Sequence, residues 1–191
     1  MLFYFKNKFP QLNAYWDKYL PFQKQMELPA RTVLLEEGKT ARQYFFVKEG
    51  CLRACFNNNG EDKTVQFFFE NEGLASLESM MKSKPSAFTV ETIEPSIIYA
   101  LDKNHFYQLI HELSYERDFV EILIEISAER QFHYMSEFVS FIRDTPEQRY
   151  LNLLQHRPHI IQRVPMHYIA SYLGVSRVHL SRIKAKLARQ K

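Results

Sequence analysis

Residues 166–185 have the sequence MHYIASYLGVSRVHLSRIKA, and this segment predicts two short helices joined by a tight turn. Two helices that cross steeply over a turn of three or four residues need small and apolar side chains at fixed offsets. The segment fills these offsets and places a glycine where the turn needs a positive φ angle. The expected core of this helix-turn-helix consists of Ile169, Ala170, Leu173, Gly174, Leu180 and Ile183.

Signals at the ends of the two helices support this prediction. Pro165 suits the first turn of the first helix, and Ser176 is a favourable N-cap for the second. The outer face of the second helix then carries Arg177, Val178 and Arg182. The start of a recognition helix enters the major groove of DNA, where arginine forms paired hydrogen bonds with guanine. We therefore expect the two arginines to contact bases and the valine to contact a thymine methyl group.

Other polar side chains of this region suit contacts with DNA phosphates, which position a protein without reading sequence. We expect this role for Arg163, His167, Ser176, His179 and Lys184. The alternative interpretation is an amphipathic helical hairpin whose arginines are simply solvated.

The charge distribution favours a polyanionic partner. The 191 residues are 46% hydrophobic and 25% charged, which is ordinary for a globular protein. Residues 143–191 contain ten Lys and Arg but only two acidic residues, a net charge of +8, whereas residues 1–142 have a net charge of −5. A basic module joined to an acidic one is typical of nucleic-acid binding, and a solvated surface is the alternative.

Residues 25–102 alternate short apolar segments with turn signals such as Glu37-Gly38 and Asn59-Gly60. The expected strands are residues 32–35, 44–48, 52–56, 64–69, 88–91 and 97–101. Repeated short strands at this spacing predict a β-sandwich or a jelly roll. Residues 1–21 precede them with a short helical pattern.

From Ser114 onward the apolar spacing becomes helical, without Gly or Pro between residues 115 and 144. This predicts a helix of about 25–28 residues, roughly 40 Å long. Such a helix is longer than a small β-roll can cover, so we expect it to pack on a second copy of itself. Thr145-Pro146 predicts the start of the next helix. The expected domains are residues 1–114, 115–142 and 143–191.

The two cysteines exclude a four-cysteine metal site within one chain. Cys51 and Cys55 lie on one face of an expected strand, about 13 Å apart, which is too far for a disulfide. We expect buried small side chains rather than a redox or metal pair. No apolar run reaches the roughly 18 residues of a membrane span, so we expect a cytoplasmic protein with no membrane partner.

A cupin-type metal or small-molecule enzyme is the rival function class for a jelly roll. Its chemistry needs two or three histidines and a carboxylate inside the barrel. All seven histidines lie outside residues 25–102. We therefore expect no enzyme activity, no catalytic residue, no bound metal and no cofactor.

The order of β-roll, long helix and helix-turn-helix resembles the CRP/FNR family of bacterial transcription regulators. The resemblance covers roughly residues 9–189 and depends on VLLEEGKTARQYFFVKEGCLR (33–53), TPEQRYLNLL (145–154) and RVPMHYIASYLGVSRVHLSRIKAKL (163–187). It implies an α+β fold with an N-terminal double-stranded β-helix (jelly-roll) sensor of the cyclic nucleotide-binding type. It also implies a dimerisation helix and a C-terminal domain of the winged-helix type. The expected partners are double-stranded DNA, a second copy, a small-molecule effector and RNA polymerase.

One stretch departs from the family pattern. Members that bind cyclic nucleotides carry a Gly-Glu pair for the sugar and an Arg-Ser or Arg-Thr pair for the phosphate. Residues 70–91, ENEGLASLESMMKSKPSAFTVE, have Pro85-Ser86 instead and lack the Gly-Glu pair at the matching distance. The phosphate would lose charge-assisted hydrogen bonds worth about 1.5–3 kcal/mol each. We therefore expect an effector other than cAMP.

The candidate effector pocket contains Glu78, Ser79 and Ser86. Two alternatives stay open. This stretch can be an ordinary surface loop in which the second serine caps a strand turn, or the whole β-roll can be a ligand-free scaffold.

Overall fold

The computed structural model describes residues 6–7 and 9–189 of the chain. The chain divides into two compact units. The first comprises residues up to 56 together with 66–122, and the second comprises residues 57–65 together with those from 123 onward.

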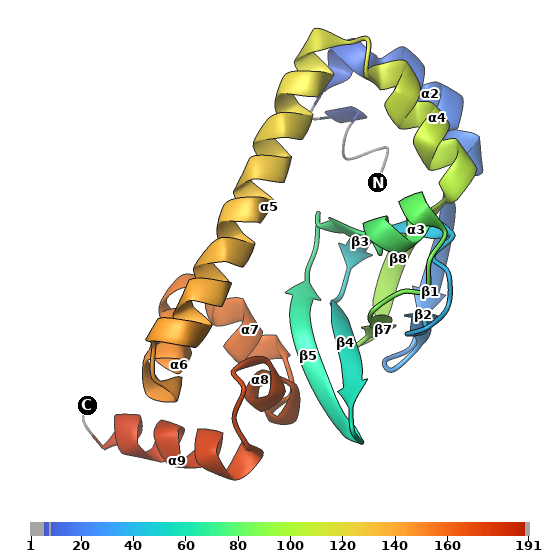
Figure 1. Cartoon of the computed structure of the whole chain (residues 1–191). Helices are drawn as coiled ribbons and strands as arrows, with labels where there is room; N and C mark the ends of the chain where they lie inside the picture. Colours follow the sequence, from blue (N-terminus) through green and yellow to red (C-terminus); the bar gives the residue numbers. More distant parts are fainter. Residues whose placement is uncertain (1–5, 8, 190–191) are drawn as a thin grey trace. The chain divides into compact units, whose positions relative to one another are not determined.

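In the described residues, eight strands form two antiparallel four-stranded sheets with the orders β1-β8-β3-β6 and β2-β7-β4-β5 (Figure 1). The strands are β1 (Lys24–Leu28), β2 (Val33–Leu35), β3 (Gln43–Glu49), β4 (Leu52–Asn58), β5 (Glu61–Phe68), β6 (Gly73–Leu74), β7 (Thr89–Thr92) and β8 (Ser96–Asp102). The six strands expected from the sequence are present, whereas β1 and the short β6 were not predicted. The α+β class is confirmed.

Alternate side chains of both sheets form one buried apolar core. Phe45 and Val47 of β3 contribute to it, as do Leu52 and Ala54 of β4, because successive side chains of a strand point to opposite faces. The other buried members are Leu35, Ala41, Phe68, Leu74, Met80, Val90, Ile98 and Ala100. Cys51 and Cys55 are both buried, as expected.

A second apolar cluster lies on the outer face of the sheet that contains β3. It joins Phe46 and Leu101, the sequence neighbours of core residues, to helices α2 (Asn13–Tyr19) and α4 (Lys103–Leu113). These two helices run side by side (Figure 1). The middle of β3 is therefore buried on both faces, which explains its uninterrupted apolar run.

In the described part of residues 1–21, the expected helical segment is interrupted. Residues 6–7 are helical, and α2 is flanked by the 3-10 helices η1 (Pro10–Leu12) and η2 (Leu20–Phe22). Two further helices of this unit, α3 (Leu77–Lys82) and α4, were not predicted. Helix α4 begins directly after β8, where the Asp102 side chain accepts a hydrogen bond from the backbone N–H of Asn104.

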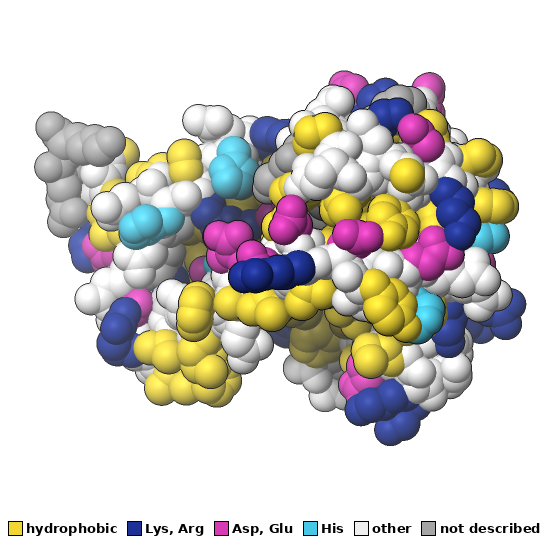
Figure 2. Space-filling view, turned by 90° about the horizontal axis from the view of Figure 1, so that it is seen from above, with side chains coloured by type: hydrophobic (Ala, Val, Ile, Leu, Met, Phe, Trp, Pro, Cys, Tyr) yellow, Lys and Arg dark blue, Asp and Glu magenta, His cyan; other side chains and the backbone are white. Residues whose placement is uncertain are grey.

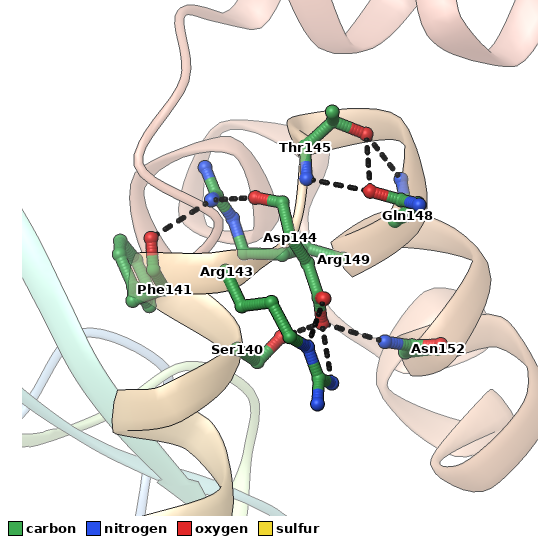
Figure 3. Close-up of polar contacts among 8 residues, drawn as sticks. All are labelled: Ser140, Phe141, Arg143, Asp144, Thr145, Gln148, Arg149 and Asn152. Atoms are coloured by element: carbon green, nitrogen blue, oxygen red, sulfur yellow. Dashed lines mark hydrogen bonds and ion pairs between the residues drawn. The ribbon is translucent and has the colours of Figure 1, made fainter.

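Helix α5 (Arg117–Arg143) has 27 residues, within the expected length. Helix α6 (Pro146–His156) follows after a tight junction, at which Thr145 is the N-cap, as predicted. The Thr145 hydroxyl accepts a hydrogen bond from Gln148 N–H, and the Gln148 side chain accepts one from Thr145 N–H (Figure 3). This capping box satisfies backbone donors that the first turn of a helix leaves unpaired.

Helices α7 (Pro158–Arg163), α8 (Met166–Tyr172) and α9 (Arg177–Ala188) complete the second unit. Pro165 is the N-cap of α8, one position before the first turn in which it was expected. Residues 123–189 contain helices and no strand, so the winged-helix part of the expectation is not confirmed.

Candidate nucleic-acid interface

The helix-turn-helix of α8 and α9 has a buried apolar core. Five of its residues are at most 5% exposed. They are Ile169 and Ala170 of α8, its C-cap Leu173, and Leu180 and Ile183 of α9. The sequence had assigned these five residues to the core. Their burial fixes which face of α9 is turned to solvent.

The turn between the two helices depends on Gly174. Its φ angle is +68°, a conformation that costs little only for glycine. A Cβ atom at this position would also lie 2.8 Å from Cε1 of Phe141, on α5. The backbone N–H of Val175 donates a hydrogen bond to the carbonyl of Ala170, which closes the end of α8.

The outer face of α9 is cationic and open to solvent. Arg177, Val178 and Arg182 are exposed, and Val178 retains 61% of its accessible surface. Lys186, further along the helix, forms an ion pair with Glu147. Among the described residues, no carboxylate pairs with Arg177 or Arg182.

The residues expected to contact phosphates lie on three elements of the second unit. Arg163 ends α7, His167 lies in the first turn of α8, and both side chains are exposed. His179 and Lys184 are exposed on α9. The Ser176 hydroxyl accepts a hydrogen bond from the His179 backbone N–H, so it caps α9.

The candidate effector residues of the first unit do not share one environment. Glu78 is exposed on α3 and forms an ion pair with Lys82. Ser79 is buried, and its hydroxyl accepts a hydrogen bond from Ala41 N–H and donates one to the Lys84 carbonyl.

Ser86 is also buried, and its hydroxyl lies within hydrogen-bond distance of the Phe88 carbonyl and of the Ser76 hydroxyl. The hydroxyl groups of both candidate serines thus already have hydrogen-bond partners within the protein. The β-roll also holds a buried guanidinium, since Arg53 forms an ion pair with Glu91 at 2.7 Å.

Helix α5 contains no buried residue. Its exposed large apolar side chains are Leu123, Ile124, Ile126, Phe132, Tyr134, Met135, Phe138, Val139, Phe141 and Ile142. Figure 2 shows one face of the molecule, on which hydrophobic side chains lie exposed beside charged ones. A helix surface of this kind is typical of an interface.

The described residues contain neither a membrane-spanning helix nor a cluster of metal-binding side chains. Their helices include none that is both long and apolar enough to cross a membrane. They also hold no group of three or more His, Cys, Asp or Glu side chains placed to bind a metal ion.

Comparison with solved structures identifies the architecture. A transcriptional regulator assigned to the CRP/FNR family, from Eubacterium rectale, has a TM-score of 0.74 at 16% identity, with 96% of this chain and 88% of that chain covered. The c-di-GMP-responsive global regulator CLP of Xanthomonas campestris has a TM-score of 0.73 at 17% identity, with 93% and 92% covered. FixK2 of Bradyrhizobium japonicum has a TM-score of 0.71 at 14% identity, with 88% of this chain and 85% of that chain covered. The chain has the fold of the CRP/FNR regulators.

The family comparison agrees with this fold. Residues 25–112 match the family model of the cyclic nucleotide-binding domain. No curated protein has significant sequence similarity to the chain. The fold that the resemblance to the CRP/FNR family implied is thereby confirmed.

Sequence reasoning missed the polar residues that join α5 to the helix-turn-helix. Tyr172 donates a hydrogen bond to Glu137, and Arg149 binds backbone carbonyl groups of α5 and of the helix-turn-helix turn. No spacing rule reveals a side chain whose partners are backbone carbonyl groups, because any residue type can supply them.

The turn glycine gives a stability prediction. Gly174→Ala and Gly60→Ala both place a side chain at a positive φ, but only the first also puts a Cβ atom against the Phe141 ring. Gly174→Ala should therefore lower the free energy of unfolding by about 1–3 kcal/mol more than Gly60→Ala does. Chemical denaturation of the two variants measures the difference. Equal losses would contradict the packing of Phe141 on this turn.

Proposed function

We propose that the chain is a sequence-specific DNA-binding regulator of transcription that acts as a homodimer and is controlled by an effector of its β-roll. The observation that carries this proposal is the exposed cationic face of α9, whose arginines Arg177 and Arg182 lack a carboxylate partner among the described residues. The CRP/FNR fold of the chain supports the assignment. Such a face is suited to the negatively charged groove of DNA.

The contacts divide into two kinds. Arg177 and Arg182 read bases, and Val178 contacts a thymine methyl group, because these side chains lie on the outer face near the start of α9. Phosphate contacts come from Arg163, His167, Ser176, His179 and Lys184. The Ser176 hydroxyl already caps α9. Ser176 therefore acts by stabilising the start of this helix, where backbone N–H groups attract the phosphate.

The second copy packs on the apolar seam of α5, which we define as Ile124, Met135, Phe138 and Ile142. These four side chains are 53–72% exposed. Together with positions 128 and 131, they are spaced alternately by four and three residues, the repeat of a two-stranded coiled coil. Two copies place two recognition helices on one duplex, with half-sites about one helical turn apart.

The effector of the β-roll is a small molecule other than cAMP. Pro85-Ser86 lacks the arginine that would bind a cyclic phosphate, and the Ser86 hydroxyl already has partners at Phe88 and Ser76. The CLP regulator, which has the same fold, responds to c-di-GMP, so the fold is compatible with other effectors. The strand order fits a jelly-roll sensor. RNA polymerase is a further proposed partner.

The DNA contacts give a prediction with an internal control. Arg182→Ala should weaken binding to the preferred site by about 1–3 kcal/mol and relax the preference at one base pair per half-site. Lys184→Ala should weaken binding to all sequences alike. Fluorescence anisotropy over a range of salt concentrations measures both effects. The wild-type slope of log K against log salt should be about −5 to −9, as for 6–10 phosphate contacts per dimer. Identical behaviour of the two variants, or a flat salt response, would contradict this assignment.

The seam gives a second prediction. Phe138→Glu should convert the dimer to a monomer, because it places two like charges in an apolar contact across the pair. Glu129→Gln, an exposed change elsewhere on α5, should leave the dimer intact. Sedimentation equilibrium measures both. A Phe138→Glu variant that stays dimeric with wild-type affinity would place the interface on another surface.

A further inference from the structure

The second unit contains a cavity of about 580 Å³ that is lined by residues of α5, α6 and α8 and of the junctions between them. Its walls carry polar groups that connect the end of α5 to the helix-turn-helix. Arg149 makes several of these connections, and Figure 3 shows it beside Phe141 and Asp144 at the junction of α5 and α6.

The Arg149 guanidinium binds two helix ends at once. Its Nη1 atom donates hydrogen bonds to the carbonyl of Asp144 at 2.8 Å and to that of Phe141 at 3.4 Å, both at the end of α5. Its Nη2 and Nε atoms donate to the carbonyl of Leu173, at 3.0 and 3.3 Å. Leu173 is the C-cap of α8.

Carbonyl groups at a helix C-terminus lack partners within the helix and lie at the negative end of its dipole. A planar guanidinium with five N–H donors can satisfy carbonyls on two sides at the same time. A lysine ammonium donates from a single nitrogen, so it lacks the planar fork whose separate nitrogens reach the two helix ends here. The function of Arg149 therefore depends on the shape of its side chain as well as on its charge.

Two further contacts join the same parts of the molecule. The Phe141 ring lies against Gly174 on one side, and its centroid is 4.6 Å from the Arg149 guanidinium. The buried Tyr172 hydroxyl donates a hydrogen bond to Glu137 at 2.7 Å. Burial and the Glu137 carboxylate raise the pKa of Tyr172, so the hydroxyl keeps the proton that it donates.

These contacts occupy one face of α5 and leave the adjacent face, which carries the apolar seam, exposed to solvent. Glu137 and Phe141 are four residues apart, so they lie above one another on the helix. The seam residues Phe138 and Ile142 each follow by one position, which is a rotation of about 100°. One face of α5 thus holds the end of α8, while the adjacent face stays available to a second copy.

We propose that Arg149 is a positioning residue that fixes the direction of the helix-turn-helix on α5, and that it thereby sets the half-site spacing accepted by the dimer. The inference rests on the proposed function. It assigns the choice of spacing to a residue that does not itself contact DNA, whereas the choice of bases within a half-site belongs to α9.

The first test compares Arg149→Gln and Arg149→Lys with the matched control Arg143→Gln. Arg143 lies at the same junction, but its side chain is 71% exposed and its ion pair with Asp144 does not reach the helix-turn-helix. DNA duplexes carry two half-sites at a series of separations. The wild type and Arg143→Gln should prefer one separation, and both Arg149 variants should lose this preference by about tenfold, the equivalent of one charge-assisted hydrogen bond.

Affinity for a single half-site separates positioning from folding. It should stay within about twofold of the wild type in both Arg149 variants, because α9 itself is unchanged. Full restoration of the spacing preference by Arg149→Lys would overturn the bridging role. Parallel loss of spacing preference and single-site affinity would overturn it as well, because that result indicates unfolding of the motif.

A measurement without DNA keeps this inference separate from the proposed function. Spin labels at Glu129→Cys on α5 and Lys184→Cys on α9, in dimers with one labelled copy, should give a narrow distance distribution. Arg149→Gln should broaden it, and Arg143→Gln should not. An unchanged distribution in Arg149→Gln would refute the positioning role. A narrow distribution in the labelled protein, together with an unlabelled wild type that binds no duplex, would refute the proposed function alone.

Discussion

The exposed apolar face of α5 is the constraint on which the rest of the second unit depends. None of the 27 residues of this helix is buried, so packing within its own chain does not account for the apolar seam. Burial of one large apolar side chain contributes about 1.5–3 kcal/mol, and pairing of two helices would bury the seam of both. Because the end of α8 is attached to the neighbouring face of α5, the proposed pairing of α5 would also determine how far apart the α9 helices of the two copies lie.

In the first unit, the buried polar side chains at the expected effector site already have partners. Arg53 is the buried guanidinium of the β-roll, and it is engaged by Glu91. Removing one partner of a buried ion pair costs about 3–5 kcal/mol, so this arginine could turn to a cyclic phosphate only at that expense. The hydroxyl groups of Ser79 and Ser86 are also engaged, since they donate hydrogen bonds to the backbone carbonyls of Lys84 and Phe88. These observations agree with the proposal that cAMP is not the effector.

Local patterns made most of the fold predictable from the sequence. The strands with buried alternate residues, the Thr145 cap and the core of the helix-turn-helix each depend on neighbours within about ten residues. Strand β1 escaped prediction because its side chains are mostly exposed, and α4 because it follows β8 without Gly or Pro. The bridge made by Arg149 was not predictable, since its acceptors are backbone carbonyls. The expected wing has no counterpart among residues 123–189.

Selection of bound duplexes from a random pool tests the central claim most directly, because one measurement reports both DNA recognition and the symmetry that paired α5 helices impose. The account predicts an enriched inverted repeat whose two halves are centred about one helical turn apart. Enrichment of a single, unrepeated half-site, or of no sequence at all, would contradict it.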